Sequence, residues 1–144
     1  YGPSSVLKMK RTDLAWAAGI IDGEGCITIR KHRTHKTFTY VLEVFVGNTD
    51  PRMIHKLKTI FNIGWIYQRK SARTRPLWIW CVKYGHAARV LELVKPYLII
   101  KKEQADVGIF SRSLIARPDQ GGRPNPNKEQ LAWLKKQLME LKHI

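Results

Sequence analysis

The 144 residues of this chain suit one domain, and a second independent core is not expected. With 26 Lys and Arg against 11 Asp and Glu, the formal charge is +15, which implies a polyanionic partner, either nucleic acid or an anionic membrane surface. The absence of an apolar run of about 18 residues and of a signal pattern predicts a soluble intracellular protein, and its two cysteines, Cys26 and Cys81, match no zinc spacing and are expected to be free thiols.

The first predicted element is a helix over residues 14–23, which follows a basic lead-in of residues 1–11. Thr12 or Asp13 stands where an N-terminal cap is expected, and Gly25 is the latest residue at which the helix can end. The helix is therefore expected to lead directly into a strand.

A β-hairpin is predicted next. Residues 26–33 and 37–46 are rich in β-branched and aromatic side chains, and the polar residues 34–36 separate them. Alternation along the second strand predicts one inward-facing set, made of Phe38, Tyr40, Leu42, Val44 and Val46. The outward-facing set consists of Thr37, Thr39 and Glu43.

A second helix is predicted over residues 48–62, with Asp50 or Thr49 as its cap and Pro51 at its first position. Its apolar stripe consists of Met53, Ile54, Leu57, Ile60 and Phe61.

Two more strands are predicted over residues 64–71 and 75–84, around an Arg-rich turn, and a helix follows over residues 85–98. The order of elements is then αββαββα, an α+β fold. A further helix is expected over about residues 101–115.

The C-terminal part begins with a break in this pattern. Residues 117–126 are rich in proline and glycine and predict a linker or an ordered loop. Asn127 with Gln130 resembles a capping box for a last helix within residues 127–144. That helix is expected to pack back on the core of residues 12–116 through Leu131, Leu134, Leu138 and Leu141.

The first helix carries a stripe of small residues. Ala15, Gly19 and Gly23 recur every four residues and share one face, with Ala18 beside them. A glycine inside a helix costs about 1 kcal/mol relative to alanine, so a close contact must offset it. Because the chain holds no second copy of the pattern, the simplest partner is the same helix of another subunit, related by a two-fold axis.

Such a dimer would bring two copies of Glu24 together, each at the negative end of a helix dipole. This arrangement is repulsive without a cation, and carboxylates, freed carbonyls and water are the oxygen ligands that Mg²⁺ prefers. The alternative is that Asp-Gly-Glu-Gly is simply a helix stop. The glycine stripe and the positive charge of the chain favour the metal site.

The stretch AAGIIDGEG, residues 17–25, resembles the motif of the LAGLIDADG homing endonucleases, and the αββαββα order is similar to their fold. The resemblance covers about residues 14–115. It implies an antiparallel, saddle-shaped DNA-binding sheet. Because the chain carries one motif, it also implies a homodimer that cuts double-stranded DNA.

The resemblance also implies roles for residues in the motif. Glu24 matches the acidic metal ligand, and Gly23 matches the position whose backbone carbonyl faces the metals. Asp22 matches the other acid, which is expected to help end the helix rather than to bind metal. The metal implied is Mg²⁺, with Mn²⁺ or Ca²⁺ able to occupy the same site.

Two later segments also match the family. FVGNTDPRM, residues 45–53, resembles the segment that supplies a polar and a basic residue to the site, here Asn48 and Arg52. KPYLIIKKEQA matches the later basic segment, which puts the site lysine at Lys101, with Lys102 as the alternative.

The chemistry of phosphodiester hydrolysis agrees with these assignments. Divalent ions held by paired Glu24 carboxylates could activate water, stabilise charge on the phosphate and assist the leaving oxygen. Lys101 and Arg52 would orient the water and stabilise the developing charge. His32 and His35 are expected to meet DNA or solvent rather than metal.

The outward face of the predicted sheet is suited to reading DNA. It carries donors, acceptors and an aromatic group that can reach base edges in the major groove, and the alternative is an ordinary solvated face. A strand of about nine residues spans about 30 Å, so a dimer would read a pseudo-palindrome of about twenty base pairs. The candidate base contacts are Thr28, Arg30, His32, Thr37, Thr39, Glu43, Tyr67, Arg69, Arg73 and Arg75. The candidate phosphate contacts are Lys31, Arg33, Lys36, Lys70, Arg117 and Arg123.

Together these features predict a homodimeric, Mg²⁺-dependent, site-specific endonuclease that acts on double-stranded DNA and has no membrane partner. Two alternatives stay open. The first is an intron RNA maturase or a DNA-binding regulator on the same fold, which binds without cutting. The second is a basic interaction module that uses no metal.

Overall fold

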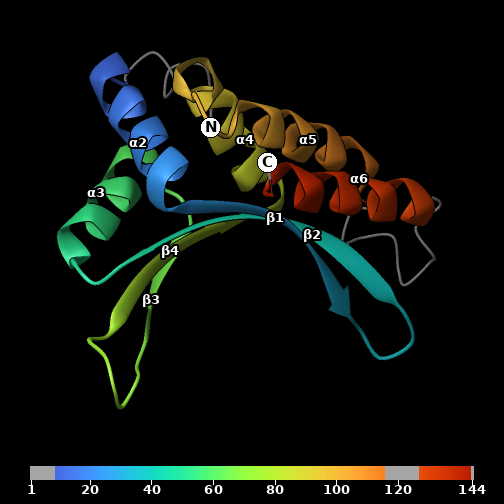
Figure 1. Ribbon diagram of the computed structural model, residues 1–144, viewed down its shortest axis with the longest axis horizontal. Helices are drawn as coiled ribbons and strands as arrows, with labels where there is room; N and C mark the ends of the chain where they lie inside the picture. The colour runs from blue at the N-terminus through green and yellow to red at the C-terminus, as the bar shows by residue number, and fades with distance from the viewer. Residues whose placement is uncertain (1–8, 116–126, 144) are drawn as a thin grey trace.

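The computed structural model describes residues 9–115 and 127–143. Figure 1 shows the predicted αββαββα order, followed by two more helices. The elements are α2 (Arg11–Glu24), β1 (Gly25–Arg33), β2 (Phe38–Asn48), α3 (Pro51–Phe61), β3 (Trp65–Arg69), β4 (Leu77–Lys83), α4 (Tyr84–Val94), a 3₁₀ turn η1 (Lys95–Tyr97), α5 (Lys102–Leu114) and α6 (Lys128–Leu141).

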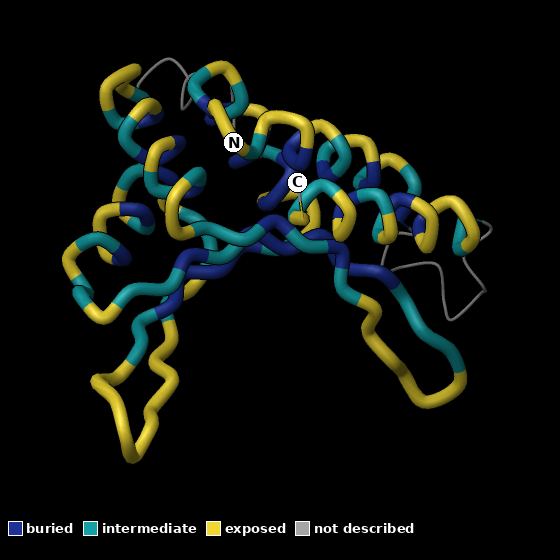
Figure 2. Tube along the Cα trace, in the orientation of Figure 1, coloured by how far each residue is buried: buried dark blue, intermediate teal, exposed yellow. Residues whose placement is uncertain are grey.

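The strands form one antiparallel sheet in the order β1-β2-β4-β3. The helices lie on one side of this sheet, and its other side is concave and open (Figure 1). The two hairpins curve away from the helices, and their tips are exposed while the centre of the sheet is buried (Figure 2). The α+β prediction and the antiparallel sheet are confirmed.

The core lies between the sheet and the helices. The predicted inward set of β2 is confirmed at Tyr40, Leu42, Val44 and Val46, all of which belong to the buried cluster. From the next strand pair, Trp80 is fully buried, stacks on Phe61 and donates from Nε1 to the carbonyl of Ile63 at 3.0 Å.

Helix α3 begins as predicted, with Asp50 as its N-cap and Pro51 at its first position. The expected caps of the first helix are wrong: α2 begins one residue before Thr12, and its N-cap is Lys10. The helix predicted over 85–98 ends at Val94 because Pro96, which has no N–H to donate, follows in a 3₁₀ turn.

Helix α6 packs back on the core as predicted, and Leu131, Leu134 and Leu138 are buried. Its capping box does not form. Asn127 is the N-cap, but its Nδ2 donates to the carbonyl of Leu114 and so joins α6 to the end of α5. The Asn127 side chain therefore connects α5 to α6 and does not cap α6.

Both cysteines are free, as predicted. Cys26 and Cys81 each lie opposite Phe45, on either side of it, so two strand spacings of about 4.8 Å separate them and no disulfide can form. No helix in the described part of the chain is long and apolar enough to cross a membrane. The loop 117–126 and most of the basic lead-in, with Arg117 and Arg123, lie outside the described residues.

Candidate active site and nucleic-acid interface

The motif helix α2 ends at two exposed residues, Gly23 and Glu24. The backbone N–H of Gly25 bonds to the carbonyl of Ile21, which closes the last turn. Within residues 9–115 and 127–143, the Glu24 carboxylate makes no side-chain hydrogen bond or ion pair. It is therefore available to a ligand from outside the chain.

The Asp22 carboxylate connects the end of α2 to residues 99–101 and does not cap its own helix. This connection is called the Asp22 clamp. The carboxylate accepts hydrogen bonds from the backbone N–H groups of Ile99 (2.8 Å), Ile100 (3.2 Å) and Lys101 (3.0 Å). The expectation that it ends its own helix is wrong, because both oxygens are occupied by a segment 77 to 79 residues away. Asp22 thereby fixes the start of α5 to the end of α2.

Lys101 completes this clamp from the other side. Its Nζ donates to the backbone carbonyl of Asp22 at 2.7 Å. That carbonyl is one of those that a helix end leaves without an intrahelical partner. The ammonium group is consequently held at the negative end of α2, on the carbonyl of Asp22, which lies two residues before Glu24.

The small-residue stripe is largely exposed. Ala15, Gly19 and Gly23 face solvent, and a Cβ atom added to either glycine would have no atom within 4 Å. Ala18 is different: it is fully buried in the core of its own chain and cannot contact a partner, so its assignment to the interface is corrected. The packing of the described residues does not require the two glycines.

Asn48 and Arg52 come together around Asp50. Asn48 Oδ1 accepts from the backbone N–H of Asp50 at 2.8 Å, and the Asp50 carboxylate binds the Arg52 guanidinium, with the closest contact from Nη2 at 2.7 Å. The side-chain hydrogen bond from Arg52 lowers the pKa of Asp50 to about 2. The sequence identified Asp50 only as a cap, although an acid two positions before an arginine at a helix start is the pattern that could have indicated this pair.

These residues form two groups. Asp22 and Lys101 are in direct contact, and Asn48 and Arg52 share Asp50. Among the described residues, no hydrogen bond or ion pair joins one group to the other. No group of three or more His, Cys, Asp and Glu side chains in that part of the chain could hold a metal ion.

Strand register gathers most of the predicted base-reading residues on the concave face. Thr28 lies opposite Glu43, and His32 lies opposite Thr39, so each pair shares a face of the sheet. From Glu43 the same face continues through the opposed residues of β4 and β3. It thus includes Thr28, Arg30, His32, Thr39, Glu43, Tyr67 and Arg69, and lies away from the helices (Figure 1).

Three predicted contacts lie outside the strands. Arg73 and Arg75 are exposed in the β3–β4 hairpin. Thr37 precedes β2, and its hydroxyl accepts a hydrogen bond from Lys128 of α6 at 2.7 Å. Thr37 thus connects the hairpin to the last helix.

Glu43 lies at the middle of the concave face and is only 8% exposed. Its Oε1 contacts Arg30 Nη2 at 3.0 Å and Lys83 Nζ at 3.2 Å. Lys83, which also lies over the ring of Trp65, was not singled out by the sequence because its role depends on strand register. Burial, together with the charge of Glu43, raises the pKa of Cys81 to about 11.

Residues 17–112 match the model of a family described as LAGLIDADG endonuclease. No curated protein matches the chain significantly.

Solved structures share the fold. The homing endonuclease I-CvuI, in complex with the I-CreI target in the presence of Mg, aligns with a TM-score of 0.76 and 20% identity over 91% of this chain and 82% of that one. The archaeal intron-encoded homing endonuclease I-Vdi141I, complexed with DNA, aligns with a TM-score of 0.73 and 13% identity. The match covers 90% of this chain and 84% of I-Vdi141I. The meganuclease I-SmaMI, bound to uncleavable DNA, aligns with a TM-score of 0.69 and 15% identity. The match covers 89% of this chain but only 45% of I-SmaMI. These likenesses confirm the fold predicted from the sequence.

Proposed function

This chain belongs to the LAGLIDADG endonuclease family, and from that membership we propose that it is a homodimeric, site-specific endonuclease that cuts double-stranded DNA with divalent metal ions. The observation that carries the proposal is the end of α2. There the exposed Glu24 carboxylate, which has no side-chain partner among the described residues, and the Lys101 ammonium, which donates to the Asp22 carbonyl, lie at the same end of the helix.

The dimer is supported by the stripe on α2. Two exposed helical glycines, each costing about 1 kcal/mol relative to alanine, have no packing role within the described chain. A second α2 helix across a two-fold axis would cover them and bring the two Glu24 carboxylates together. The 45% coverage of I-SmaMI is what we expect if two copies of this chain correspond to one chain of that protein.

The donor set at this point suits Mg²⁺, with Mn²⁺ or Ca²⁺ as substitutes. Glu24 offers carboxylate oxygens and Gly23 offers a backbone carbonyl from the helix end, and oxygen donors of this kind are the ones these ions prefer. One chain supplies too few ligands alone, so the site requires the second copy. When bound, the ions would supply a more acidic water and stabilise negative charge on the phosphate.

The side chains around this site prepare it for an anionic substrate. An ammonium group has three donors, and Lys101 uses one of them on the Asp22 carbonyl. The others remain to orient a water or a phosphate oxygen. Arg52, with a side chain 89% exposed, presents a guanidinium already oriented by Asp50.

The concave face would contact the duplex. Its curvature and its cationic hairpins suit a DNA backbone, whose phosphates attract Lys and Arg without regard to sequence. Base discrimination would fall to side chains such as Arg30, which Glu43 holds in a defined position.

Cleavage of the insertion site tests this function. The substrate is a duplex that joins the two DNA segments flanking the gene, and the expected result with Mg²⁺ is a double-strand break at the junction. Glu24→Gln should bind the duplex as the wild type does and leave it intact, because the substitution removes a metal ligand and no other contact. The proposal is contradicted if the wild type, like Glu24→Gln, leaves the duplex whole.

Two controls separate the alternatives. Binding to intron RNA without cleavage of the duplex would favour a maturase, and loss of folding in Glu24→Gln would favour a structural helix end. The mass in solution should be twice the 16.7 kDa of one chain. A monomer mass, with and without DNA, would contradict the dimer.

A further inference from the structure

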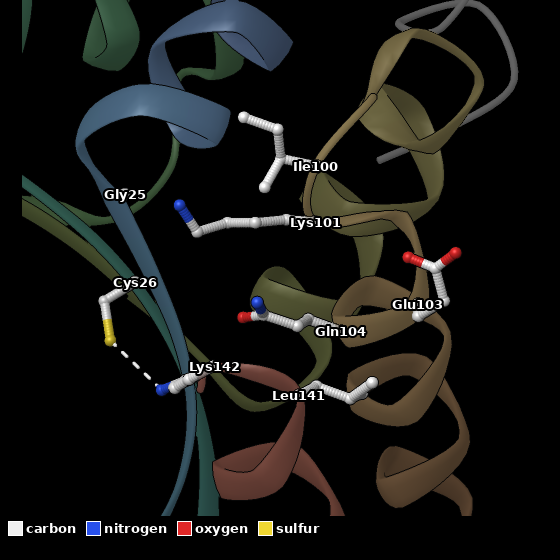
Figure 3. Close-up of a pocket in the computed structure, with 8 residues that line it drawn as sticks. All are labelled: Gly25, Cys26, Ile100, Lys101, Glu103, Gln104, Leu141 and Lys142. Carbon is white, nitrogen blue, oxygen red and sulfur yellow. Dashed lines mark hydrogen bonds between the residues drawn. The ribbon is translucent and has the colours of Figure 1, made fainter. Parts of the chain in front are cut away.

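A pocket beside the candidate site shares Lys101 with it, but the other residues of the pocket have no role in the function proposed above. It has a volume of about 630 Å³ and lies between the start of β1, the first turn of α5 and the end of α6 (Figure 3). The residues that line it are Gly25, Cys26, Ile100, Lys101, Glu103, Gln104, Leu141 and Lys142.

Gln104 is the unexplained group in this pocket. Its side chain is 6% exposed and its Oε1 has no hydrogen-bond partner among the described residues. Figure 3 shows its amide directed toward β1, across the pocket. By contrast, the other buried polar side chain of α5, Ser111, bonds to the carbonyl of Gly108. A buried amide without a partner is costly, so the pocket is expected to receive a hydrogen-bonding ligand.

The charges of the side chains around Gln104 favour an anionic ligand. The Nζ of Lys101 donates to a neutral carbonyl and the Nζ of Lys142 contacts Cys26 Sγ at 3.4 Å, so neither ammonium is neutralised by a carboxylate. Glu103 also lines the pocket but is exposed, and Figure 3 shows its carboxylate on the α5 side, apart from the Gln104 amide and from Lys142. The Nε2 of the same Gln104 amide is a donor that has no hydrogen-bond partner among the described residues and from which an anion can accept.

The position of the pocket connects it to DNA. Cys26 lies opposite Phe45 and therefore on the concave face that carries Thr28 and Glu43. The pocket begins at Gly25, immediately after Glu24. A DNA strand that passes from the sheet to the end of α2 would cross its mouth.

We propose that this pocket binds a phosphate of the DNA backbone that neighbours the phosphate at which the strand is cut. The donors are Gln104 Nε2 and Lys142 Nζ. The inference rests on the proposed function, and it assigns roles to α5 and α6 that the endonuclease motif does not include. Lys142 supplies a charge, whereas Gln104 supplies a neutral donor that has no partner among the described residues.

Salt-dependent binding tests the role of Lys142. The affinity for a 30-base-pair duplex of arbitrary sequence is measured with Ca²⁺ at several salt concentrations for wild type, Lys142→Ala and Lys136→Ala. Lys136 is the matched control because it is an exposed lysine of α6, the helix that Lys142 directly follows, and does not line the pocket. Lys142→Ala should reduce the slope of log K against log salt by about 0.9, the value for one phosphate contact, with little change in Lys136→Ala. Equal slopes for wild type and Lys142→Ala, or equal losses in both variants, would overturn the proposal.

Gln104→Leu tests the neutral donor. We expect its duplex affinity to fall about tenfold with the slope unchanged, because one hydrogen bond to a charged group is lost but no charge. Its thermal midpoint should equal or exceed that of the wild type, since a buried group without a partner has been removed. Wild-type affinity in Gln104→Leu, or a lower midpoint with unaltered affinity, would show that Gln104 is only structural.

Two further results separate the possible failures. If the wild type does not bind duplex at all, the proposed function fails and this inference fails with it. If the wild type cuts its target and both variants bind like the wild type, only this inference fails. Inorganic phosphate is the second probe: if it raises the thermal midpoint of the wild type but not of Lys142→Ala, while their duplex slopes are equal, the pocket takes free phosphate and the proposal is overturned.

Discussion

Replacing Asp22 with asparagine weakens the clamp between α2 and α5. The carboxylate accepts three backbone hydrogen bonds, one on Oδ2 and two on Oδ1. The single oxygen of an asparagine amide can keep at most two of them, and its NH₂ group then opposes the remaining N–H. Hydrogen bonds to a charged acceptor contribute about 1.5–3 kcal/mol each, and the freed N–H of Ile99, an exposed residue, can turn to water. The expected loss is therefore about 2–3 kcal/mol, well below the gross sum.

Urea denaturation measures this loss. With a slope of about 2 kcal/mol per molar urea, the midpoint of Asp22→Asn should fall by about 1 M. Hydrogen exchange should become faster at the amides of Ile99, Ile100 and Lys101, most of all at the amide that loses its acceptor, because the segment is held by fewer hydrogen bonds. Cleavage should fall as well, since the segment that carries Lys101 is held less firmly against the end of α2.

Glu24→Gln is the matched control for this variant. It makes the same change of charge two positions away, at an exposed residue without side-chain partners in the described chain, so its stability should stay within about 0.5 kcal/mol of the wild type. The clamp is refuted if Asp22→Asn unfolds at the wild-type urea concentration with the three amides still protected. It is also refuted if Glu24→Gln is equally destabilised.

Three further predictions concern the interface, the second site group and the thiols. Gly19→Leu should keep the chain folded but shift sedimentation from dimer to monomer, because its side chain meets open space within the chain and would meet the partner helix in the dimer; an unchanged dimer would contradict the interface. The pKa of Asp50 is lowered from 3.8 to about 2 by Arg52, so the pair stabilises the folded state above about pH 4 and this contribution is lost as the pH falls toward 2. The difference in urea midpoint between wild type and Asp50→Asn should shrink over that interval, whereas a difference that persists at pH 2 would argue against the pair. A thiol reagent at pH 8 should modify Cys26 and spare Cys81, which is buried and has a pKa raised to about 11, as peptide mass analysis would show; equal labelling would contradict that burial.

Local patterns in the sequence determined the elements and their order. The alternation of β2, the stripe of α3 and the Asp50-Pro51 start depend on residues close together in the chain, and all are observed. The family could also be identified from the sequence, because its motif is one continuous stretch of residues. The residues placed on the concave face followed from the two-residue period of the strands.

Contacts between distant segments were decided only by the tertiary structure. Asp22 looked like a helix stop because no local pattern reveals that Ile99 and its neighbours donate to it from 77 or more positions away. Lys83 and Glu43 form their pair only through the register of β2 against β4, and Gln104 faces Lys142 only because α6 returns to the edge of β1. Short-range propensity and periodicity are properties of a segment, whereas partners, burial and open space belong to the packing of several segments. The sequence by itself therefore determined the framework and the motif, and packing decided what each polar group does within it.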